Sequence, residues 1–237
     1  MKAVILAGGK GTRLAPYTTA FPKPLMPIGD RPILDIVLRQ LAASGFDDIT
    51  LAVGHLAELI MAYCGDGSRY GVSLGYSRED APLGTAGPLA QVPGIESTFL
   101  TMNGDLLTAI DYREMVALHR ARGHVATVAT FERDITVDLG VIETDDHEMV
   151  INYREKPTIR YLASTGIYVF EPDVLKHIQP NVRLDLPDLI LSLVAQQLPV
   201  GNYAFRGRWL DIGRHDDYAE ANAVFESHRD EFLPRDS

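Results

Sequence analysis

The chain has 237 residues, of which 46% are apolar, and a formal net charge of −10 at pH 7. This length and composition predict one large globular domain with a proper hydrophobic core. The acidic balance argues against a nucleic-acid-binding protein, which needs a basic face. Because Cys64 is the only cysteine, internal disulfides and a thiolate zinc site are excluded, and a reducing cytosol is favoured.

No stretch of the sequence is long and apolar enough for a membrane span, which takes about 18 or more uninterrupted apolar residues. The apolar run that follows Lys2 is also too short for a signal peptide. We therefore expect a cytoplasmic protein that does not bind a membrane.

The first half of the chain alternates between strand-like and helical patterns. Strands are predicted at 3–6, 49–53, 72–76 and 98–102, and helices at 32–44, 55–63 and 112–122. The last helix has the clearest ends, with Asp111 as its N-cap and Gly123 after its C-terminus. This order predicts an α/β fold with a Rossmann-like, mixed and mostly parallel sheet, covered by helices on both faces.

The second half is less regular. Strands are predicted at 125–131, 140–144, 148–153 and 166–170, and two helices at 187–197 and 217–228. His119 and His124 flank a helix end and are expected to be solvated. Three aromatic residues are expected to be strand and core residues: Tyr161, Tyr168 and Phe170.

Residues 6–27 are the most informative stretch. A short apolar strand ends in the glycine-rich sequence GGKGTRL, which starts at Gly8. Glycines let backbone N–H groups approach an oxyanion closely, so a strand ending in such a turn can cradle phosphate. Lys10, Arg13 and Lys23 add three cations, and prolines on both sides of Lys23 fix its backbone. These parts in this order predict a triphosphate site, rather than a plain glycine turn with surface cations.

This stretch resembles the signature of the sugar-1-phosphate nucleotidyltransferases, also called nucleotide-sugar pyrophosphorylases. The matching residues are GGxGTRL from Gly8 and PKPLxP from Pro22. The pattern is not a Rossmann fingerprint, because Leu14 stands in the place of the third glycine, and no Walker loop occurs. The motifs are closest to GDP-mannose pyrophosphorylase-like and manno-heptose 1-phosphate guanylyltransferase members.

The resemblance implies a single nucleotidyltransferase domain over residues 1–237. Its nucleotide-binding half would span about 1–110 and its sugar-phosphate-binding half about 111–215, with a C-terminal helix and tail at 216–237. No hexapeptide repeat follows Trp209, so we expect no C-terminal β-helix of the kind that many relatives carry.

The implied reaction is attack of a sugar 1-phosphate on the α-phosphorus of an NTP, which releases pyrophosphate. Both reactants are anions, so catalysis depends on positioning and electrostatics. The resemblance implies that Arg13 and Lys23 are catalytic. Mg²⁺ is the expected cofactor, and Asp105 and Asp211 resemble its ligands in the family's NGD and WxDIG contexts. A lone NGD would ordinarily be a turn.

The nucleotide would be bound by residues from the first strand, the glycine-rich turn and the segment 78–89: Leu6, Ala7, Gly8, Gly9, Gly11, Thr12, Arg13, Glu79, Gly84 and Thr85. The sequence PLGTAGPL in that segment resembles the GDP-mannose branch. A Glu79 carboxylate would accept from N1–H and N2–H₂ of guanine, so the base assignment leans towards GTP. The same reaction with dTTP, UTP or CTP remains the alternative, with glucose 1-phosphate or another sugar 1-phosphate.

The sugar phosphate would be bound by Asn103, Gly140, Glu155, Lys156 and Thr165. Glu155 and Lys156 belong to an E-K-P motif, which would otherwise be a charged hairpin end. Ser164 departs from the family pattern, because relatives often have Asn there. The favoured acceptor is a manno-configured hexose or heptose 1-phosphate.

Two rival functions start from other features. A glycosyltransferase usually needs Asp-x-Asp for its metal, and this sequence has none. A non-catalytic, nucleotide-sugar-sensing subunit would be expected to lose some of four residues that this chain keeps: Arg13, Lys23, Asp105 and Asp211. The expected partners are an NTP and a sugar 1-phosphate, without nucleic acid, and a homodimer is left open.

Overall fold

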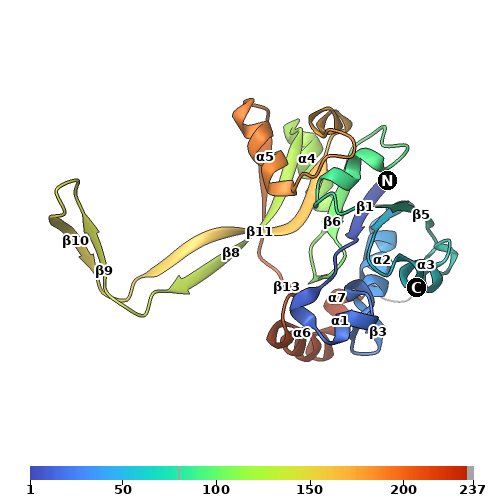
Figure 1. The fold of residues 1–237 in the computed structure, drawn as a ribbon, viewed down its shortest axis with the longest axis horizontal. Coiled ribbons are helices and arrows are strands. Elements are labelled where there is room, and N and C mark those ends of the chain that lie inside the picture. Colours follow the sequence, from blue (N-terminus) through green and yellow to red (C-terminus); the bar gives the residue numbers. More distant parts are fainter. Residues whose placement is uncertain (80, 234–237) are drawn as a thin grey trace.

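The computed structural model describes residues 1–79 and 81–233. Asp80, which belongs to the predicted nucleotide segment, and residues 234–237 of the predicted tail lie outside the described residues. A seven-stranded sheet crosses the body of the molecule in the order β12-β8-β11-β6-β1-β4-β5 (Figure 1). The bounds of these strands are Val200–Phe205, Ala126–Thr136, Thr158–Phe170, Phe99–Asn103, Lys2–Ala7, Asp48–Val53 and Ser73–Arg78.

The strand directions confirm the mixed, mostly parallel sheet. β1 is parallel to β4 and β6, β4 is parallel to β5, and β12 is parallel to β8. Within this described sheet, only β11 runs in the opposite direction, between β6 and β8. Parallel strands need crossover connections, which the helices of the first half supply.

Helices cover both faces of the sheet, as predicted. The described helices are α1 Tyr17–Ala20, α2 Ile33–Ala43, α3 Ala57–Cys64, α4 Tyr112–Arg122, α5 Leu186–Ala195, α6 His215–Ser227 and α7 Arg229–Phe232. None of the helices in the described part of the chain is long and apolar enough to cross a membrane. Asp111 caps α4 by accepting from Glu114 N–H at 2.9 Å, and Gly123 follows it at φ 62°.

Two hydrophobic cores lie on opposite faces of the sheet. Ile5 of β1 packs in the larger core with α2, α3, α4 and α6, whereas Val4 packs in the smaller core with α5. Successive side chains of a strand point to opposite faces, so β1 is buried on both sides. This explains why its sequence is continuously apolar rather than alternating.

Short elements connect the large ones. Three two-stranded ladders pair β2 Pro27–Ile28 with β3 Arg31–Pro32, β7 Leu106–Thr108 with β13 Trp209–Asp211, and β9 Val141–Thr144 with β10 Val150–Arg154. The 3₁₀ turns are η1 Thr12–Leu14, η2 Lys23–Leu25, η3 Ser68–Tyr70, η4 Gly87–Gln91 and η5 Pro172–His177. No β-helix occurs among residues 1–79 and 81–233.

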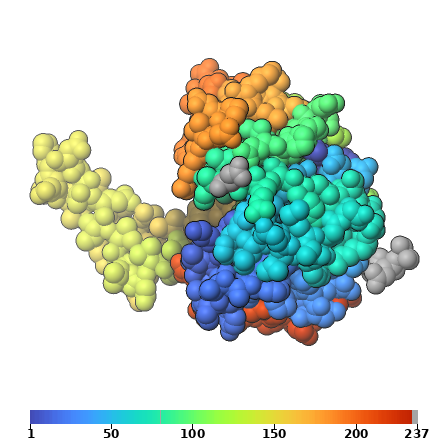
Figure 2. All heavy atoms as spheres, turned by 45° about the vertical axis from the view of Figure 1, so that its right-hand side comes forward, coloured from blue at the N-terminus to red at the C-terminus, as the bar shows by residue number. Residues whose placement is uncertain are grey.

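Residues 131–164, here called the arm, project from the body. β12 ends opposite Phe131, and beyond it β8 and β11 remain paired as a two-stranded ribbon, from Glu132 opposite Leu162 to Thr136 opposite Thr158. The β9–β10 hairpin forms the tip of the arm (Figure 1). The space-filling view shows the arm standing clear of the body, with open solvent beside it (Figure 2).

The arm and its neighbours account for most differences from the predicted elements. The strand predicted at 166–170 begins at Thr158, and the one predicted at 125–131 continues to Thr136, because the two strands pair with each other outside the body. The pattern also missed β12, whose burial is mostly partial. The predicted core residue Tyr161 is 45% exposed on the arm, whereas Tyr168 and Phe170 are buried as expected.

The prediction for His119 was wrong. His119 is fully buried, with its Nδ1 2.8 Å from Thr127 Oγ1 and its Nε2 3.1 Å from Glu171 Oε1. The histidine lies on the inner face of α4 and finds polar partners on β8 and after β11. Buried polar groups are stable when they are hydrogen-bonded in this way.

Candidate functional site

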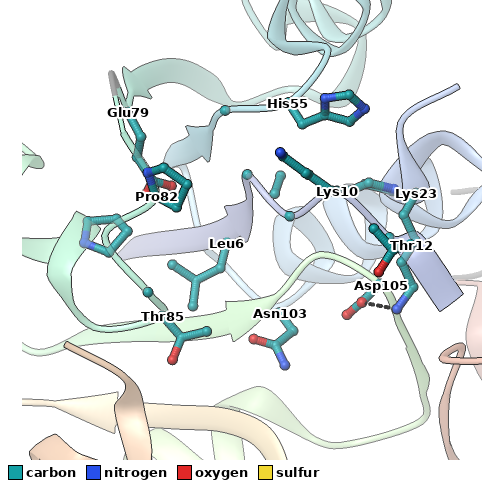
Figure 3. Close-up of a pocket in the computed structure, with 18 of the residues that line it drawn as sticks. Leu6, Lys10, Thr12, Lys23, His55, Glu79, Pro82, Thr85, Asn103 and Asp105 are labelled. Carbon is teal, nitrogen blue, oxygen red and sulfur yellow. Dashed lines mark hydrogen bonds and ion pairs between the residues drawn. The ribbon is translucent and has the colours of Figure 1, made fainter. Parts of the chain in front are cut away.

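A cavity of about 690 Å³ lies at the carboxyl edge of the sheet, where β1, β4, β5 and β6 end. Chain reversals after parallel strands gather at one edge, which is the usual place for a ligand in an open α/β sheet. The predicted residues that line this pocket are Leu6, Ala7, Gly8, Gly9, Gly11, Thr12, Arg13, Lys23, Glu79, Gly84, Thr85, Asn103 and Asp105. The structure therefore brings all the predicted nucleotide residues together (Figure 3).

The glycine loop, residues 8–14, forms one wall of the pocket. Gly8 packs so closely that an added Cβ would lie 2.6 Å from Glu79 Oε1. Gly9 has open space where its Cβ would be, so its backbone faces the cavity without obstruction. Gly11 adopts φ +61° and accepts a hydrogen bond from Thr18 Oγ1 at 2.7 Å. The loop can thus present its backbone to an anion at short range.

Lys23 and Asp105 form an ion pair at the other end of the pocket from Glu79 (Figure 3). Lys23 opens the 3₁₀ turn η2 after Pro22, whose backbone is extended, and its side chain is largely buried. Asp105 follows β6, which places its carboxylate beside the glycine loop. Both residues were predicted for the site from the sequence, from two motifs that lie 82 positions apart.

Asp211 joins the same cluster through β13. Pairing of β13 with β7 sets Asp211 opposite Leu106, next to Asp105, and Ile212 N–H donates to the Asp105 carbonyl at 3.4 Å. Burial and then the negative charge of Asp105 raise the pKa of Asp211 above its usual value, against the opposing effect of Lys23 and Arg13. The two neighbouring carboxylates therefore favour the binding of a positively charged group beside them.

These carboxylates fit a divalent cation that also binds substrate phosphates. Asp105 Oδ1 is buried and has no hydrogen-bond partner among the described residues, so it can bind a further ligand. In the described part of the chain, no group of three or more His, Cys, Asp or Glu side chains could hold a metal. Mg²⁺ is usually held by one or two carboxylates together with phosphate oxygens and water, so two carboxylates suffice.

Glu79 lies on the wall of the pocket opposite the ion pair. Its Oε2 accepts from Leu83 N–H at 2.9 Å, and burial raises the pKa of its carboxyl above the usual value. Its Oε1 faces Gly8 and has no hydrogen-bond partner among the described residues. This oxygen is therefore available to a ligand.

Residues 183–185 hold the pocket loop that contains Gly84 and Thr85. The Leu184 carbonyl accepts from the N–H groups of Ala86 and Gly87 at 2.9 and 3.1 Å, and Asp185 Oδ1 accepts from Thr85 N–H at 3.0 Å. Sequence reasoning missed this contact, because about 100 positions separate the two segments. Arg183 and His55 also line the pocket and were missed. The only sequence signal for His55 was its place after a predicted strand.

Asp217 was also missed by sequence reasoning. Asp105, Asp211 and Asp217 are here called the aspartate cluster. A Cβ built on Gly213 would lie 3.3 Å from Asp217 Oδ2, 3.4 Å from Arg13 Nη1 and 3.5 Å from Asp211 Oδ2. All three side chains thus surround Gly213. From the sequence, Asp217 was taken only as the start of a helix, and it does lie in the first turn of α6.

The structure does not bring the remaining predicted sugar residues to this pocket. Gly140, Glu155 and Lys156 lie at the tip of the arm, where Lys156 Nζ pairs with Asp138 Oδ1 at 3.0 Å and Glu155 accepts from the Tyr153 hydroxyl at 2.8 Å. Thr165 is buried at the root of the arm and donates to the Ala129 carbonyl at 2.9 Å. Its own carbonyl accepts from Trp209 Nε1–H at 2.9 Å.

Comparison with known families and curated proteins gives consistent matches. The profile of the family described as "Nucleotidyl transferase" matches residues 2–228. A UTP–glucose-1-phosphate uridylyltransferase of Synechocystis is 39% identical over 93% of this chain and 62% of the relative. A mannose-1-phosphate guanylyltransferase of Mycobacterium tuberculosis is 31% identical over 93% of this chain and 63% of the relative. The chain thus spans less than two thirds of the length of either relative.

Solved structures agree on the fold. A crystal structure of a Bacillus anthracis protein in complex with sucrose has a TM-score of 0.76 and 28% identity, and the match covers 98% of both chains. HddC from Yersinia pseudotuberculosis, complexed with GMP-PN, has a TM-score of 0.72 over 94% of this chain and 99% of that chain. At 22% identity, this second match speaks for the fold alone.

Proposed function

Because this chain belongs to the nucleotidyl transferase family, whose profile spans residues 2–228, we propose that it transfers a nucleotidyl group from an NTP to a sugar 1-phosphate. The products would be an NDP-sugar and pyrophosphate. The observation that carries this proposal is the convergence of the glycine loop, Arg13 and the Lys23–Asp105 pair in one pocket. Its other end offers the free Oε1 of Glu79.

In the proposed reaction, an oxygen of the sugar 1-phosphate attacks the α-phosphorus, and the bond from that phosphorus to the bridging oxygen of pyrophosphate breaks. Backbone N–H groups of the glycine loop and Arg13 would neutralise the departing β- and γ-phosphates. Lys23 would bind the reacting phosphates from its fixed position. Catalysis of such transfers depends mainly on charged groups held in position in a site from which water is partly excluded.

We propose that Asp105 and Asp211 hold Mg²⁺, as their orphaned oxygen and raised pKa, respectively, favour. When bound, this ion would supply positive charge between the phosphates of the two substrates. Arg13 and Lys23, which lie beside these two aspartates, would balance the remaining phosphate charge.

For the base, the proposal leans towards guanine. The free oxygen of Glu79, next to the Oε2 that already binds Leu83 N–H, can accept from N1–H or N2–H₂ of guanine. The rival bases are uracil and thymine, which a protonated or amide partner would suit better. The uridylyltransferase of Synechocystis, at 39% identity, is a specific reason to test UTP with glucose 1-phosphate alongside GTP.

For the acceptor, we propose a manno-configured hexose or heptose 1-phosphate, and the guanylyltransferase relatives are named for mannose 1-phosphate. A cytoplasmic setting and the absence of nucleic-acid and membrane partners complete the proposal. These proposals rest on relatives of greater length and on the acidic composition of this chain.

The test is pyrophosphate release with Mg²⁺ across a grid of GTP, UTP, CTP, ATP and dTTP against mannose, glucose and manno-heptose 1-phosphates. Release confined to GTP supports the assignment of Glu79, and the active sugar column identifies the acceptor. Turnover with UTP, dTTP or CTP keeps the reaction and rejects the base assignment. Absence of release in every well, from folded protein that binds an NDP-sugar, favours the sensing subunit instead.

A further inference from the structure

The ribbon of the arm has two chemically different faces. In the β8–β11 ladder, Ile159 lies opposite Ile135, Tyr161 opposite Arg133, and Ala163 opposite Phe131. Directly opposed residues share a face of a sheet, and every second residue returns to that face. These positions therefore make one mostly apolar face, here called the apolar face of the arm.

The other face of the ribbon is polar and internally paired. Arg160 donates to Asp134 at 3.2 Å and lies 3.5 Å from Glu132, and the hydroxyls of Thr136 and Thr158 are 3.2 Å apart. Leu162 is the single large apolar residue on this face, opposite Glu132. The polar face is thus suited to water, and the apolar face is not.

The tip continues the same division. Ile142 lies opposite Tyr153 on one face of the β9–β10 hairpin, whereas Glu143 and Arg154 form an ion pair on the other. Of the seventeen large hydrophobic side chains that are exposed in the described residues, ten lie on the arm. An isolated two-stranded ribbon is at best marginally stable in water, so this surface calls for a cover.

The arm cannot bend along its length onto its own pocket without losing its ladder. Pairing is continuous from Thr130 opposite Ser164 to Thr136 opposite Thr158, and the register shifts only at the root, between Ser164 and Tyr168. A reversal anywhere along this ribbon would break backbone hydrogen bonds that now pair its strands. In the arrangement of this structure, in which the arm stands clear of the body, its cover therefore comes from another molecule.

The apolar face begins beside the proposed active site. The ring of Phe131 lies 6.0 Å from that of Trp209, and the guanidinium of Arg133 lies over the same ring at 5.9 Å. Trp209 belongs to β13, two residues before Asp211. A molecule that covers the root of the arm therefore lies next to the aspartate cluster.

We propose that the apolar faces of the arms of two copies of this chain pack against each other, antiparallel, about a two-fold axis. The same patch is self-complementary in such a dimer, because the tip of each arm meets the root of the other. The tip residues 137–157 include six acidic and two basic residues, and Arg133 is the one charged residue on the apolar face of the ribbon, so it would meet the acidic tip of the partner. Burial of about 100 Å² from each of the nine exposed large hydrophobic side chains of the arm other than Leu162 would cover on the order of 1,800 Å² in total, within the range of specific, stable interfaces.

This dimer completes the active site in trans. Lys156 lies seven residues from Ala163, which is about 23 Å along an extended strand. An antiparallel crossing centred on Ile159 and Ile135 therefore carries the Glu155–Lys156 turn to the root of the partner's arm, beside Trp209. The assignment of this turn to the sugar phosphate rests on the proposed function, whereas the dimer itself does not.

The dimer is tested by sedimentation equilibrium and light scattering on the full chain. Ile159→Lys, on the apolar face, is expected to give a monomer, and Leu162→Lys, on the polar face three residues away, is the matched control that stays a dimer. Ile135→Lys repeats the test if Ile159→Lys does not fold. A wild-type monomer, or a dimer that survives both apolar-face substitutions, overturns the proposal. These outcomes do not depend on catalysis, so they are distinguishable from failure of the proposed function.

Completion in trans is tested by mixing two inactive variants, Lys156→Ala in the arm and Asp211→Ala in the pocket. After exchange of subunits, half of the dimers are mixed and each has one intact site, so activity should return to about a quarter of the wild-type level. If each chain completes its own site, the mixture stays inactive and the trans arrangement is overturned. Wild-type chain that is a dimer but releases no pyrophosphate with any substrate would instead reject the proposed function.

Discussion

Lys23 and Asp105 form an ion pair that joins two separate walls of the pocket. Lys23 is fixed by a 3₁₀ turn after an extended proline, and Asp105 by the turn that follows β6. The second carboxylate oxygen of Asp105 is buried and has no hydrogen-bond partner within residues 1–79 and 81–233. The pair is therefore held in place before substrate binds. The unpartnered oxygen of Asp105 can still bind a cation, and Lys23 can move its ion pair from Asp105 to a phosphate.

Replacement of this lysine should remove most of the activity. Lys23→Met keeps the apolar stem and removes the charge, and loss of one transition-state donor costs about 10²–10³-fold in turnover. Steady-state pyrophosphate release is the measurement. Lys176→Met is the matched control, because Lys176 is exposed on η5 and pairs only with the nearby Asp173 in the described residues. Equal rates for the two variants would contradict the role of Lys23.

Asp211→Asn should abolish Mg²⁺-dependent turnover without unfolding the chain. Burial and the charge of Asp105 raise the pKa of Asp211, which means that the folded state disfavours its charge. The neutral amide should therefore leave the apo protein at least as stable as the wild type. Thermal unfolding with and without Mg²⁺ checks this, since the wild type gains stability from the ion and the variant does not. Asp216→Asn, in the same first turn of α6, is the control, and undiminished turnover in Asp211→Asn would reject the metal site.

Glu79→Gln should change the choice of base. The amide can keep an acceptor towards Leu83 N–H but then presents an N–H donor where Oε1 now lies. We expect the ratio of kcat/KM for GTP to that for UTP to fall by about tenfold or more, the worth of a charge-assisted hydrogen bond. Glu58→Gln is the control, since Glu58 pairs with Arg78 on an exposed site. A ratio that does not change would remove Glu79 from base recognition.

The sequence predicts the pocket well because its parts are local. Each nucleotide motif follows directly from a strand of the parallel sheet, and parallel strands must end at one edge, so Gly8, Glu79 and Asp105 meet without further information. The arm could not be foreseen in this way. The alternation of apolar and polar residues in its strands, around Ile135 and Tyr161, is equally typical of strands within the body. The local pattern does not say whether the apolar face packs against the same chain or against another.

Polar contacts between residues far apart in the sequence were the other feature that the sequence did not predict. Asp185 and Asp217 look like ordinary helix-start residues in the sequence, and only the folded chain shows one at the Thr85 backbone and the other beside Arg13. The prediction that His119 is solvated was wrong for a related reason. Its hydrogen-bond partners lie on β8 and after β11, and these bonds offset the cost of its burial.

Gly84→Ala should disrupt the pocket loop beyond the usual cost of its backbone conformation. Gly84 and Gly94 both adopt positive φ, at +80° and +69°, so alanine is strained at either site by roughly 1–2 kcal/mol. Only at Gly84 would the new Cβ meet the Leu184 carbonyl, at 2.5 Å, whereas Gly94 has open space. Urea unfolding should show a larger loss for Gly84→Ala, and nucleotide affinity should fall in that variant alone. Equal losses and intact affinity would show that the loop accommodates the methyl group.

Stability should fall as the pH is lowered below about 6.5, and His119 should be a cause. Burial lowers the pKa of His119, although Glu171 opposes this effect. As the pH drops below about 6.5, the unfolded chain takes up a proton on this histidine before the folded chain does, so the free energy of unfolding decreases. Urea unfolding between pH 5 and 7 should show a smaller pH dependence for His119→Gln. The exposed His147→Gln is the control, and a slope identical to wild type in His119→Gln would exclude this contribution.

The hydrogen bonds from Leu184 to the pocket loop have a consequence for biosynthesis. On the ribosome, the glycine loop and the strands up to β6 emerge long before the segment 183–185 that holds Ala86 and Gly87. A nascent chain can therefore form its first parallel strands while the nucleotide pocket is still unsupported. Nucleotides of the cell can therefore stabilise the complete pocket only after residues 183–185 have left the exit tunnel.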